Sequence, residues 1–225
     1  MTVTERLLDC ASDVWARYHS HPFVLGLGDG TLDVEKFKYY MVQDYLYLFD
    51  YARVFALGVV KARDEQTMRQ FAGYVHQILE GEMELHRGYM ARLGIPREEA
   101  EAAAPAQDNL SYTAYMLRVA WEEGPAEIAA CILACALSYE HIARRILEGR
   151  PEAADHPLYG EWVRGYADAG YSAANRELSA LTERLAAGYD EAGLGRLEEF
   201  FLRCSRYELA FWDMAWEARG WDAAL

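Results

Sequence analysis

The sequence has 225 residues and no proline-rich or glycine/serine-rich linker, so we expect a single domain over residues 1–225. Its formal net charge of −14 argues against binding to nucleic acid or to an anionic membrane surface, because both need clustered lysine and arginine. The longest uncharged apolar run, residues 128–137, is about half of the ~20 residues that span a bilayer. We therefore expect a soluble protein that acts on a small molecule or a protein partner.

Apolar residues recur every three or four positions from end to end, which predicts an all-α helical bundle. The glycines of residues 26–30 lack the spacing of a phosphate loop and follow no strand, so we expect a turn between helices there. Glycine, proline and alanine breaks separate the other segments, and Ala169-Gly170 interrupts the sixth of them. The predicted helices span residues 3–18, 33–62, 64–92, 108–122, 125–148, 157–186 and 190–218.

The second predicted helix places Asp44 in the middle of its apolar stripe, among Phe37, Met41, Leu48 and Tyr51. A carboxylate in such a place is desolvated unless a partner meets it, because a buried charge is rarely tolerated alone. Asp44 is then either a residue at the edge of the stripe, paired to an arginine or a phenol, or a group that binds a ligand.

Two further helices repeat this arrangement. Cys135 lies on the apolar stripe of the fifth predicted helix, one turn before Tyr139, and Glu208 lies on the stripe of the last. A lone helical cysteine usually packs as a small apolar residue, but helical bundles also build their sites from side chains on facing helices. A thiol, a phenol and two carboxylates on apolar stripes favour a reactive site over packing alone.

The four cysteines are spread through helical segments and do not form a disulfide frame. We expect reduced thiols in a cytoplasmic protein. The N-terminal segment is amphipathic and acidic, unlike a signal peptide. Several of the sixteen tyrosines fall beside the candidate groups, where aromatic rings can line a pocket for a flat heteroaromatic ligand.

A carboxylate–histidine metal site is an alternative. Glu82 and His86 lie one turn apart, and Glu140, His141 and Glu208 offer further ligands. The Glu-x-x-His pairs of di-iron bundles are absent from the sequence, so we interpret Glu82 and His86 as a polar pair that contacts a neighbouring segment.

Haem is a second cofactor to consider, since His19 or His21 could be an axial ligand. A histidine directly before Pro22 more often caps a helix, so we expect neither a metal nor another cofactor.

Seven short motifs, in order and over about residues 10–218, resemble the TenA / thiaminase II family. The motifs are His21–Val24, Asp29–Leu32, Phe37–Leu48, Tyr112–Met116, Cys135–Tyr139, Trp162–Tyr166 and Glu208–Ala215. The resemblance implies a haem-oxygenase-like helical fold without haem, usually as a homotetramer. It also implies an aminopyrimidine aminohydrolase of thiamin salvage, which releases ammonia from 4-amino-5-aminomethyl-2-methylpyrimidine, with hydrolysis of thiamin as a related activity.

The resemblance also implies residue roles. Cys135 matches the nucleophile, Tyr139 the phenol beside it, and Glu208 the acid that acts on the leaving group. Asp44 matches the aspartate that holds the pyrimidine's amino group and ring nitrogen.

Three aromatic positions match the substrate pocket, and they are Tyr47, Tyr112 and Tyr166. A metal- or haem-dependent oxidase on the same fold and a non-catalytic helical interaction protein are the alternatives.

Overall fold

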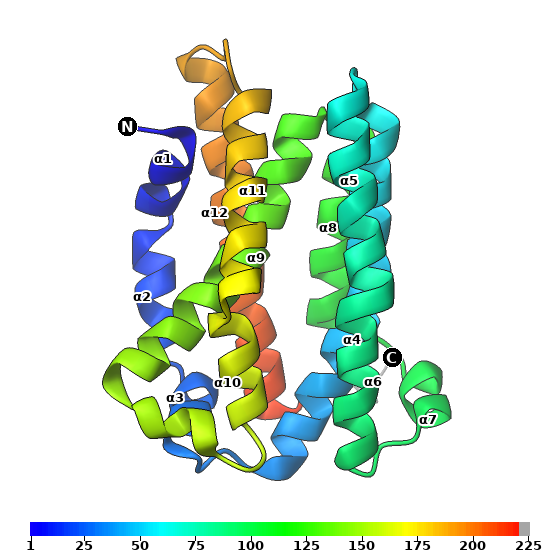
Figure 1. Ribbon diagram of the computed structural model, residues 1–225, viewed down its shortest axis with the longest axis vertical. Coiled ribbons are helices and arrows are strands. Elements are labelled where there is room, and N and C mark those ends of the chain that lie inside the picture. The colour runs from blue at the N-terminus through cyan, green and yellow to red at the C-terminus, as the bar shows by residue number, and fades with distance from the viewer. Residues whose placement is uncertain (221–225) are drawn as a thin grey trace. The chain divides into compact units, whose positions relative to one another are not determined.

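The computed structural model describes residues 1–220 (Figure 1). Helices dominate, and no strand occurs among these residues, so the predicted all-α class is confirmed. The α-helices are α1 (Val3–Cys10), α2 (Ser12–Ser20), α3 (Pro22–Asp29), α4 (Val34–Lys61), α5 (Glu65–Gln77), α6 (Met83–Arg92), α7 (Arg97–Ala102), α8 (Gln107–Glu122), α9 (Pro125–Gly149), α10 (Gly160–Ala167), α11 (Ala169–Leu185) and α12 (Glu191–Glu217). A π-helical turn, η1 (Ile78–Glu82), joins α5 to α6, and a 3₁₀ turn, η2 (Pro151–Asp155), follows α9.

The chain forms two compact units. Unit 1 contains residues 1–33 and 129–213, and unit 2 contains residues 34–128 with the stretch that follows residue 213. The boundaries between them fall inside α9 and α12. One domain over residues 1–225 stays a prediction, and its last five residues lie outside the part of the chain described here.

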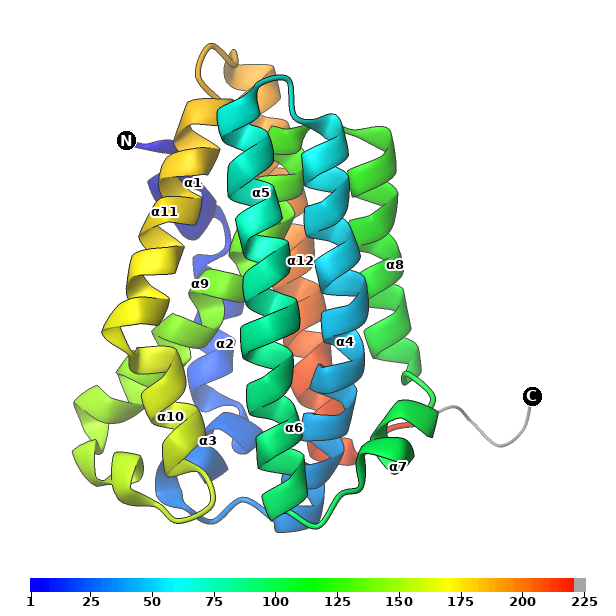
Figure 2. The same cartoon turned by 45° about the vertical axis from the view of Figure 1, so that its right-hand side comes forward.

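In unit 2, α4 packs against α5, α6, α7 and α8 (Figure 2). Its buried side chains repeat at helical spacing, as the sequence predicts, and they include Asp44. Gln43 fixes the start of α8: its Oε1 accepts from the backbone N–H of Ala106 at 2.8 Å, and its carbonyl accepts from Asn109 Nδ2 at 2.8 Å. Because these polar groups are buried, their hydrogen bonds set the register between α4 and α8.

The turn η1 changes the buried face of the α5–α6 segment, which the sequence predicts as one regular helix. Buried positions step by three or four up to Ile78, and the next buried side chain, Met83, comes five residues later. A π turn inserts one extra residue into a helix, which accounts for this step. From Met83 the three-residue step resumes, and it brings His86 onto the buried face.

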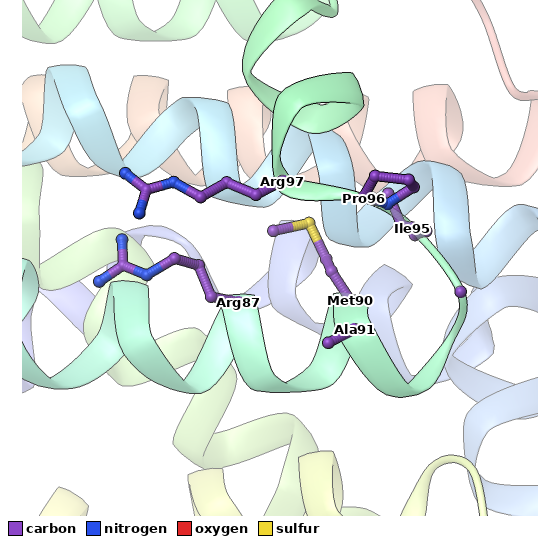
Figure 3. Close-up of a pocket in the computed structure, with 7 residues that line it drawn as sticks. Arg87, Met90, Ala91, Ile95, Pro96 and Arg97 are labelled. Carbon is purple, nitrogen blue, oxygen red and sulfur yellow. The ribbon is translucent and has the colours of Figure 1, made fainter.

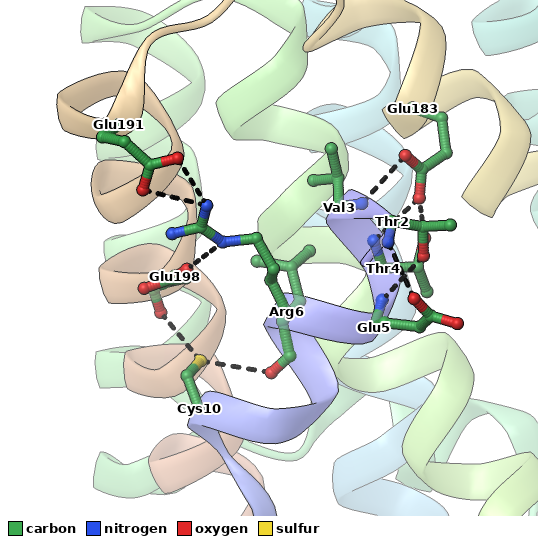
Figure 4. A network of polar contacts seen from close by, with 10 residues as sticks. Thr2, Val3, Thr4, Glu5, Arg6, Cys10, Glu183, Glu191 and Glu198 are labelled. Carbon is green, nitrogen blue, oxygen red and sulfur yellow. Dashed lines mark hydrogen bonds and ion pairs between the residues drawn. The ribbon is translucent and has the colours of Figure 1, made fainter.

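In unit 1, the first turn of α1 is tied to α11 and α12 (Figure 4). Thr2 caps α1, and Glu183 accepts from the backbone N–H groups of Val3 at 2.9 Å and Thr4 at 2.8 Å. Arg6 donates to Glu198 at 2.7 Å and to Glu191 at 3.0 Å. The carboxylate of Glu183 therefore satisfies orphan N–H groups that every helix start presents.

The largest difference from prediction lies in residues 22–29, which form helix α3 and not a turn. Pro22 occupies its first position, where no N–H is needed, and His21 caps it by accepting from the Phe23 N–H at 3.2 Å. The capping role expected for His21 is therefore confirmed. Gly30 ends the helix in the left-handed conformation, with φ of +70°.

Smaller points of comparison concern where helices begin and end. The first predicted helix breaks at Ala11 into α1 and α2. The interruption predicted in the sixth segment is confirmed, since α10 ends at Ala167 and Asp168 caps α11. The segment after Pro96 forms the short helix α7, in the gap between the predicted helices of residues 64–92 and 108–122.

Helix α9 is long and apolar enough to cross a membrane, but 78% of its most apolar window is buried inside the protein. That burial is typical of the core helix of a soluble protein.

Candidate active site

Asp44 lies on the buried face of α4, where only 5% of it is exposed. Its Oδ2 atom accepts from the Tyr40 hydroxyl at 3.1 Å and lies 2.7 Å from Nε2 of His86 on α6. His86 Nδ1 lies 2.9 Å from the backbone carbonyl oxygen of Glu82. Asp44 is therefore a partnered carboxylate inside unit 2, and the predicted Glu82–His86 pair does contact a neighbouring segment, namely α4.

The charges around Asp44 are coupled. Burial lowers the pKa of His86, but the hydrogen bond to Asp44 and the negative charges of Asp44 and Glu82 outweigh it, so this pKa is raised. Burial raises the pKa of Glu82 to about 7, against the opposing effect of His86. The neighbouring carboxylates therefore favour the charged form of His86, and Glu82 is an acid with a pKa near neutral.

Two of the predicted pocket tyrosines meet in unit 2. The rings of Tyr47, from α4, and Tyr112, from α8, have centroids 5.4 Å apart, and both side chains are buried. The Tyr47 hydroxyl contacts the sulfur of Met116 at 3.5 Å, and its ring stacks on Tyr51. Because Tyr47 stands one turn after Asp44, this aromatic surface continues from the carboxylate along α4.

In unit 1, Tyr139 and Tyr166 belong to one aromatic cluster. Their ring centroids lie 4.7 Å apart, and both rings contact Trp162, at 5.9 Å from Tyr139 and 4.8 Å from Tyr166. Trp212, from α12, lies 5.4 Å from Tyr139 and also contacts Phe23. The cluster joins α9, α10 and α12, and it holds both phenols that the sequence predicts.

The cysteines of unit 1 differ in their surroundings. Cys131 and Cys204 are fully buried and hydrogen-bond to each other, and burial raises the pKa of Cys204 well above its ordinary value. Cys10 donates to the carbonyl oxygens of Leu7 at 3.1 Å and Glu198 at 3.6 Å, and burial raises its pKa to about 11 (Figure 4). Cys135 keeps 9% exposure. Cys10 and Cys204 are thus held as thiols, the poorly nucleophilic form, while Cys135 is the most exposed of the three cysteines on α9 and α12.

Glu208 is 2% exposed on α12, and it shares neighbours with Cys135. Burial raises the pKa of the Tyr18 phenol well above its ordinary value, and the charges of Glu208 and Cys135 add to this shift. Both groups also raise the pKa of Cys204. The Tyr18 hydroxyl donates to the Ser205 carbonyl oxygen at 2.6 Å. The acid and the thiol therefore act on the same two buried groups within unit 1.

Several residues of these clusters make contacts that the sequence-based prediction does not assign, although some of them lie inside the family motifs. They are Tyr40, His86 as the partner of Asp44, Tyr18, Trp162 and Trp212. Only His86 could have been indicated by the sequence, as a polar residue on the buried side of an amphipathic segment. The extra residue of the π turn shifts it out of the regular helical spacing, so the pattern does not show it.

The groups weighed as metal or haem ligands have other contacts. Glu140 accepts from Arg144 at 2.8 Å and Asn175 at 2.7 Å, and His141 Nε2 lies 2.9 Å from His19 Nε2. His21 Nε2 pairs with Asp213 at 3.2 Å. Within residues 1–220, no group of three His, Cys, Asp or Glu side chains is arranged to hold a metal ion.

A cavity of about 330 Å³ lies in unit 2, at the corner between α6 and α7 (Figure 3). Met90, Ile95 and Pro96 line its apolar side, and the Arg87 and Arg97 side chains extend in the same direction. Arg87 pairs with Glu84 at 2.6 Å, and Arg97 pairs with Glu101 at 2.7 Å. Each guanidinium is thus neutralised by its own carboxylate.

The fold defines an all-helical protein that buries ionisable side chains in each of its two units. The sequence matches the TENA/THI-4/PQQC family over residues 9–218. The aminopyrimidine aminohydrolase of Halalkalibacterium halodurans is 44% identical over 222 residues, which cover 99% of each chain. That of Helicobacter pylori is 40% identical over 97% of this chain and 100% of the relative. The chain belongs to the TENA/THI-4/PQQC family, as its motifs indicate.

Solved structures agree with this assignment. A TenA homologue from P. horikoshii OT3 superimposes with a TM-score of 0.88 at 29% identity, over 96% of this chain and 99% of that one. A domain from Shewanella denitrificans with a heme oxygenase-like fold matches with a TM-score of 0.78 at 14% identity, over 97% of this chain and 93% of that one. The second match concerns the fold alone, and it confirms the predicted haem-oxygenase-like class.

Proposed function

We propose that this protein is an aminopyrimidine aminohydrolase of thiamin salvage. Its substrate would be 4-amino-5-aminomethyl-2-methylpyrimidine, which water converts to the hydroxymethylpyrimidine and ammonia, and thiamin would be a second substrate. The observation that carries the proposal is the match, over nearly the whole chain, to relatives named aminopyrimidine aminohydrolase at 44% and 40% identity.

The chemistry assigned to each residue follows from its properties. The Cys135 thiolate adds to the electron-poor pyrimidine ring, and this addition lets the amine on the neighbouring side chain leave. Glu208, a carboxyl on an apolar helix face, gives a proton to the departing amine. Water then adds where the amine left, the carbon–sulfur bond breaks, and the thiol is restored.

The remaining residues bind and orient the ring. The Asp44 carboxylate accepts from the 4-amino group, while the faces of Tyr47 and Tyr112 offer an apolar surface for a flat ring. Tyr139 and Tyr166 are assigned to the substrate on the side of the thiol, since Tyr139 stands one turn after Cys135 on α9 and its ring contacts that of Tyr166.

An ammonia-release assay with the aminomethylpyrimidine, run beside a thiamin-hydrolysis assay, tests this function directly. We expect ammonia at a rate that is linear in enzyme, with hydroxymethylpyrimidine formed in equal amount. A folded, purified protein that releases no ammonia would leave the interaction-protein alternative. Metal analysis and an absorption spectrum of the same sample would reveal an oxidase cofactor.

We further propose a cytoplasmic homotetramer. Exposed apolar residues support self-association: Val60 is 73% exposed at the end of α4, and Trp121 is 66% exposed at the end of α8. These ends are neighbours, because Lys61 Nζ donates to the Trp121 carbonyl oxygen at 2.6 Å. A subunit contact over these two helix ends would remove both apolar side chains from water. Light scattering should give a particle four times the 25.6 kDa chain, and a monomer at micromolar concentration would contradict this.

A further inference from the structure

His86 forms a chain of short polar contacts that runs from the backbone of η1 to Asp44. Its Nδ1 atom lies 2.9 Å from the Glu82 carbonyl oxygen, and its Nε2 atom lies 2.7 Å from Asp44 Oδ2. Both His86 and Asp44 are buried, with 6% and 5% exposure. In a buried chain of this kind, each short contact must contain a proton. Two acceptors that face each other without a proton repel, and no water lies between them to relieve the repulsion.

The contacts limit where the protons of the His86–Asp44 pair can lie, and the contact length and the Tyr40 donor then place the shared proton on the imidazole. A carbonyl oxygen only accepts, so the contact with Glu82 requires a proton on Nδ1. The contact between Nε2 and Asp44 requires a second proton, because a bare imidazole nitrogen and a carboxylate are both acceptors. Its length of 2.7 Å is that of a charge-assisted hydrogen bond. The Tyr40 hydroxyl donates to the same oxygen at 3.1 Å, which favours the ionised carboxylate.

The contacts also orient the carboxylate. Among residues 1–220, the hydrogen bonds to the Asp44 side chain both fall on Oδ2, from Tyr40 and from His86. The other oxygen, Oδ1, therefore keeps its capacity to accept from a ligand. An ionised carboxylate only accepts, so it selects a ring that carries an amino group over one that carries an oxygen at the same position.

We propose that His86 is a positioning residue of the pyrimidine site. As a doubly protonated imidazolium it keeps Asp44 ionised and leaves Oδ1 directed at the ligand. The protein therefore selects 4-aminopyrimidines over 4-oxopyrimidines. The inference rests on the proposed function for the identity of the ligand. It goes beyond that function by assigning the amino-over-oxo selectivity to a residue that need not touch the substrate.

Removing the imidazolium should change selectivity as well as affinity. In His86→Leu the buried Asp44 has lost its cation, and burial then favours the protonated acid, which can donate to a 4-oxo group. We expect the preference for 4-amino-5-hydroxymethyl-2-methylpyrimidine over its 4-oxo analogue to fall by about 10- to 100-fold, the size of one charge-assisted hydrogen bond. A general loss of structure would weaken both ligands together and leave their ratio unchanged.

The experiment is a calorimetric titration of both pyrimidines into four proteins. Tyr40→Phe removes a hydrogen bond to the same oxygen and keeps the imidazolium, so it should retain most of the selectivity. His76→Leu, an exposed histidine on α5, is the matched control and should behave as wild type. An unchanged ratio in a folded His86→Leu protein would overturn the inference.

A spectroscopic test needs no ligand and no variant. Nitrogen-15 NMR of the wild-type protein at pH 7 should show protons on both ring nitrogens of His86, and a bare Nε2 would overturn the proposal. If the wild type releases no ammonia but His86 is doubly protonated, the proposed function fails and the assignment of charge stands. If ammonia is released and the ratio of affinities for the 4-amino and 4-oxo pyrimidines is the same in His86→Leu as in wild type, only the inference fails.

Discussion

The rings of Tyr139 and Tyr166 lie with their centroids 4.7 Å apart, and this contact joins α9 to α10 inside unit 1. Tyr166 also contacts Trp162 and Tyr171, so its ring holds three neighbours while it remains partly exposed. Its ring and its hydroxyl can therefore be tested separately.

Tyr166→Phe should fold with nearly unchanged stability, because the ring contacts stay. It should lose activity, because the hydroxyl assigned to the substrate is removed. Tyr166→Ala should also lose roughly 1–3 kcal/mol of stability, since aromatic pairs contribute beyond their buried area. Urea denaturation and ammonia release measure the two effects. Full activity in the phenylalanine variant would show that the hydroxyl has no part in the reaction.

Cys135→Ala should abolish ammonia release, while Cys131→Ala, one turn earlier on α9, should stay active. Both substitutions remove one small group and should cost roughly 0.5–3 kcal/mol. If both cysteines only pack, the two substitutions should change ammonia release by similar amounts. If Cys135 is the nucleophile, only its loss should matter, since Cys131 has Cys204 as its partner and no role in the proposed reaction. Activity, circular dichroism and thermal midpoints of both variants decide the matter. Substantial activity without Cys135 would exclude covalent catalysis.

Glu208→Gln should keep the fold and the binding of the pyrimidine but reduce turnover by roughly 10²- to 10⁴-fold, the usual loss when a general acid is removed. The amide preserves the shape of a side chain that is 2% exposed, but it cannot transfer a proton. Steady-state kinetics with the aminomethylpyrimidine provide the measurement. A rate within threefold of wild type would mean that another group moves the proton.

Asp44→Asn should weaken product binding by roughly 1.5–3 kcal/mol, because it removes a charge-assisted hydrogen bond. The amide also cannot balance the His86 imidazolium, so the histidine should lose its Nε2 proton at neutral pH. Calorimetry reports the first effect and nitrogen NMR the second. Equal affinities for wild type and variant would contradict the binding role of Asp44.

Glu82→Gln should alter how stability depends on pH. Burial raises the pKa of Glu82 from 4.5 to about 7, so the folded state holds this proton more tightly than the unfolded state. The contribution of this proton to the free energy of unfolding is therefore full below pH 4.5 and is lost as the pH rises through 7. The glutamine variant does not titrate, so its stability relative to wild type should rise between pH 4.5 and 8.

The matched control is Glu84→Gln, two residues further on. The hydrogen bond from Arg87 lowers the pKa of Glu84, which gives a pH dependence of the opposite sign. Urea midpoints at a series of pH values should therefore move in opposite directions for the two variants. Parallel curves would contradict the raised pKa of Glu82.

Helices α4, α9 and α12 could be predicted to within one residue at each end, because their apolar stripes run without interruption between clear breaks. The same regularity indicates that Asp44, Cys135 and Glu208 face inward, and burial of all three confirms it. A periodic stripe reports which side of a helix is buried. It carries no information on what that side meets.

The parts that could not be predicted depend on tertiary contacts or on local exceptions. Glycines in residues 26–30 suggest a turn, yet Pro22 and the His21 cap start a helix that continues through Gly26 and Gly28. The partner of Asp44 is His86, 42 residues away in sequence, and no helical spacing relates the two. The pairing of Cys131 with Cys204 joins helices that sequence spacing cannot relate.

The π turn at Ile78–Glu82 gives up regular helical hydrogen bonding and in return positions His86. Each residue of a helix advances its side chains by about 100°, so deleting one residue from η1 would restore regular α-helix and swing His86 away from α4. A regular helix has better backbone hydrogen bonds than a π turn, so the shortened segment gains local order while Asp44 is left without its cation. Leaving the buried Asp44 without its cation, and turning Met83 off the buried face, would destabilise the fold, so the irregular turn serves both the packing of this segment and the proposed selectivity.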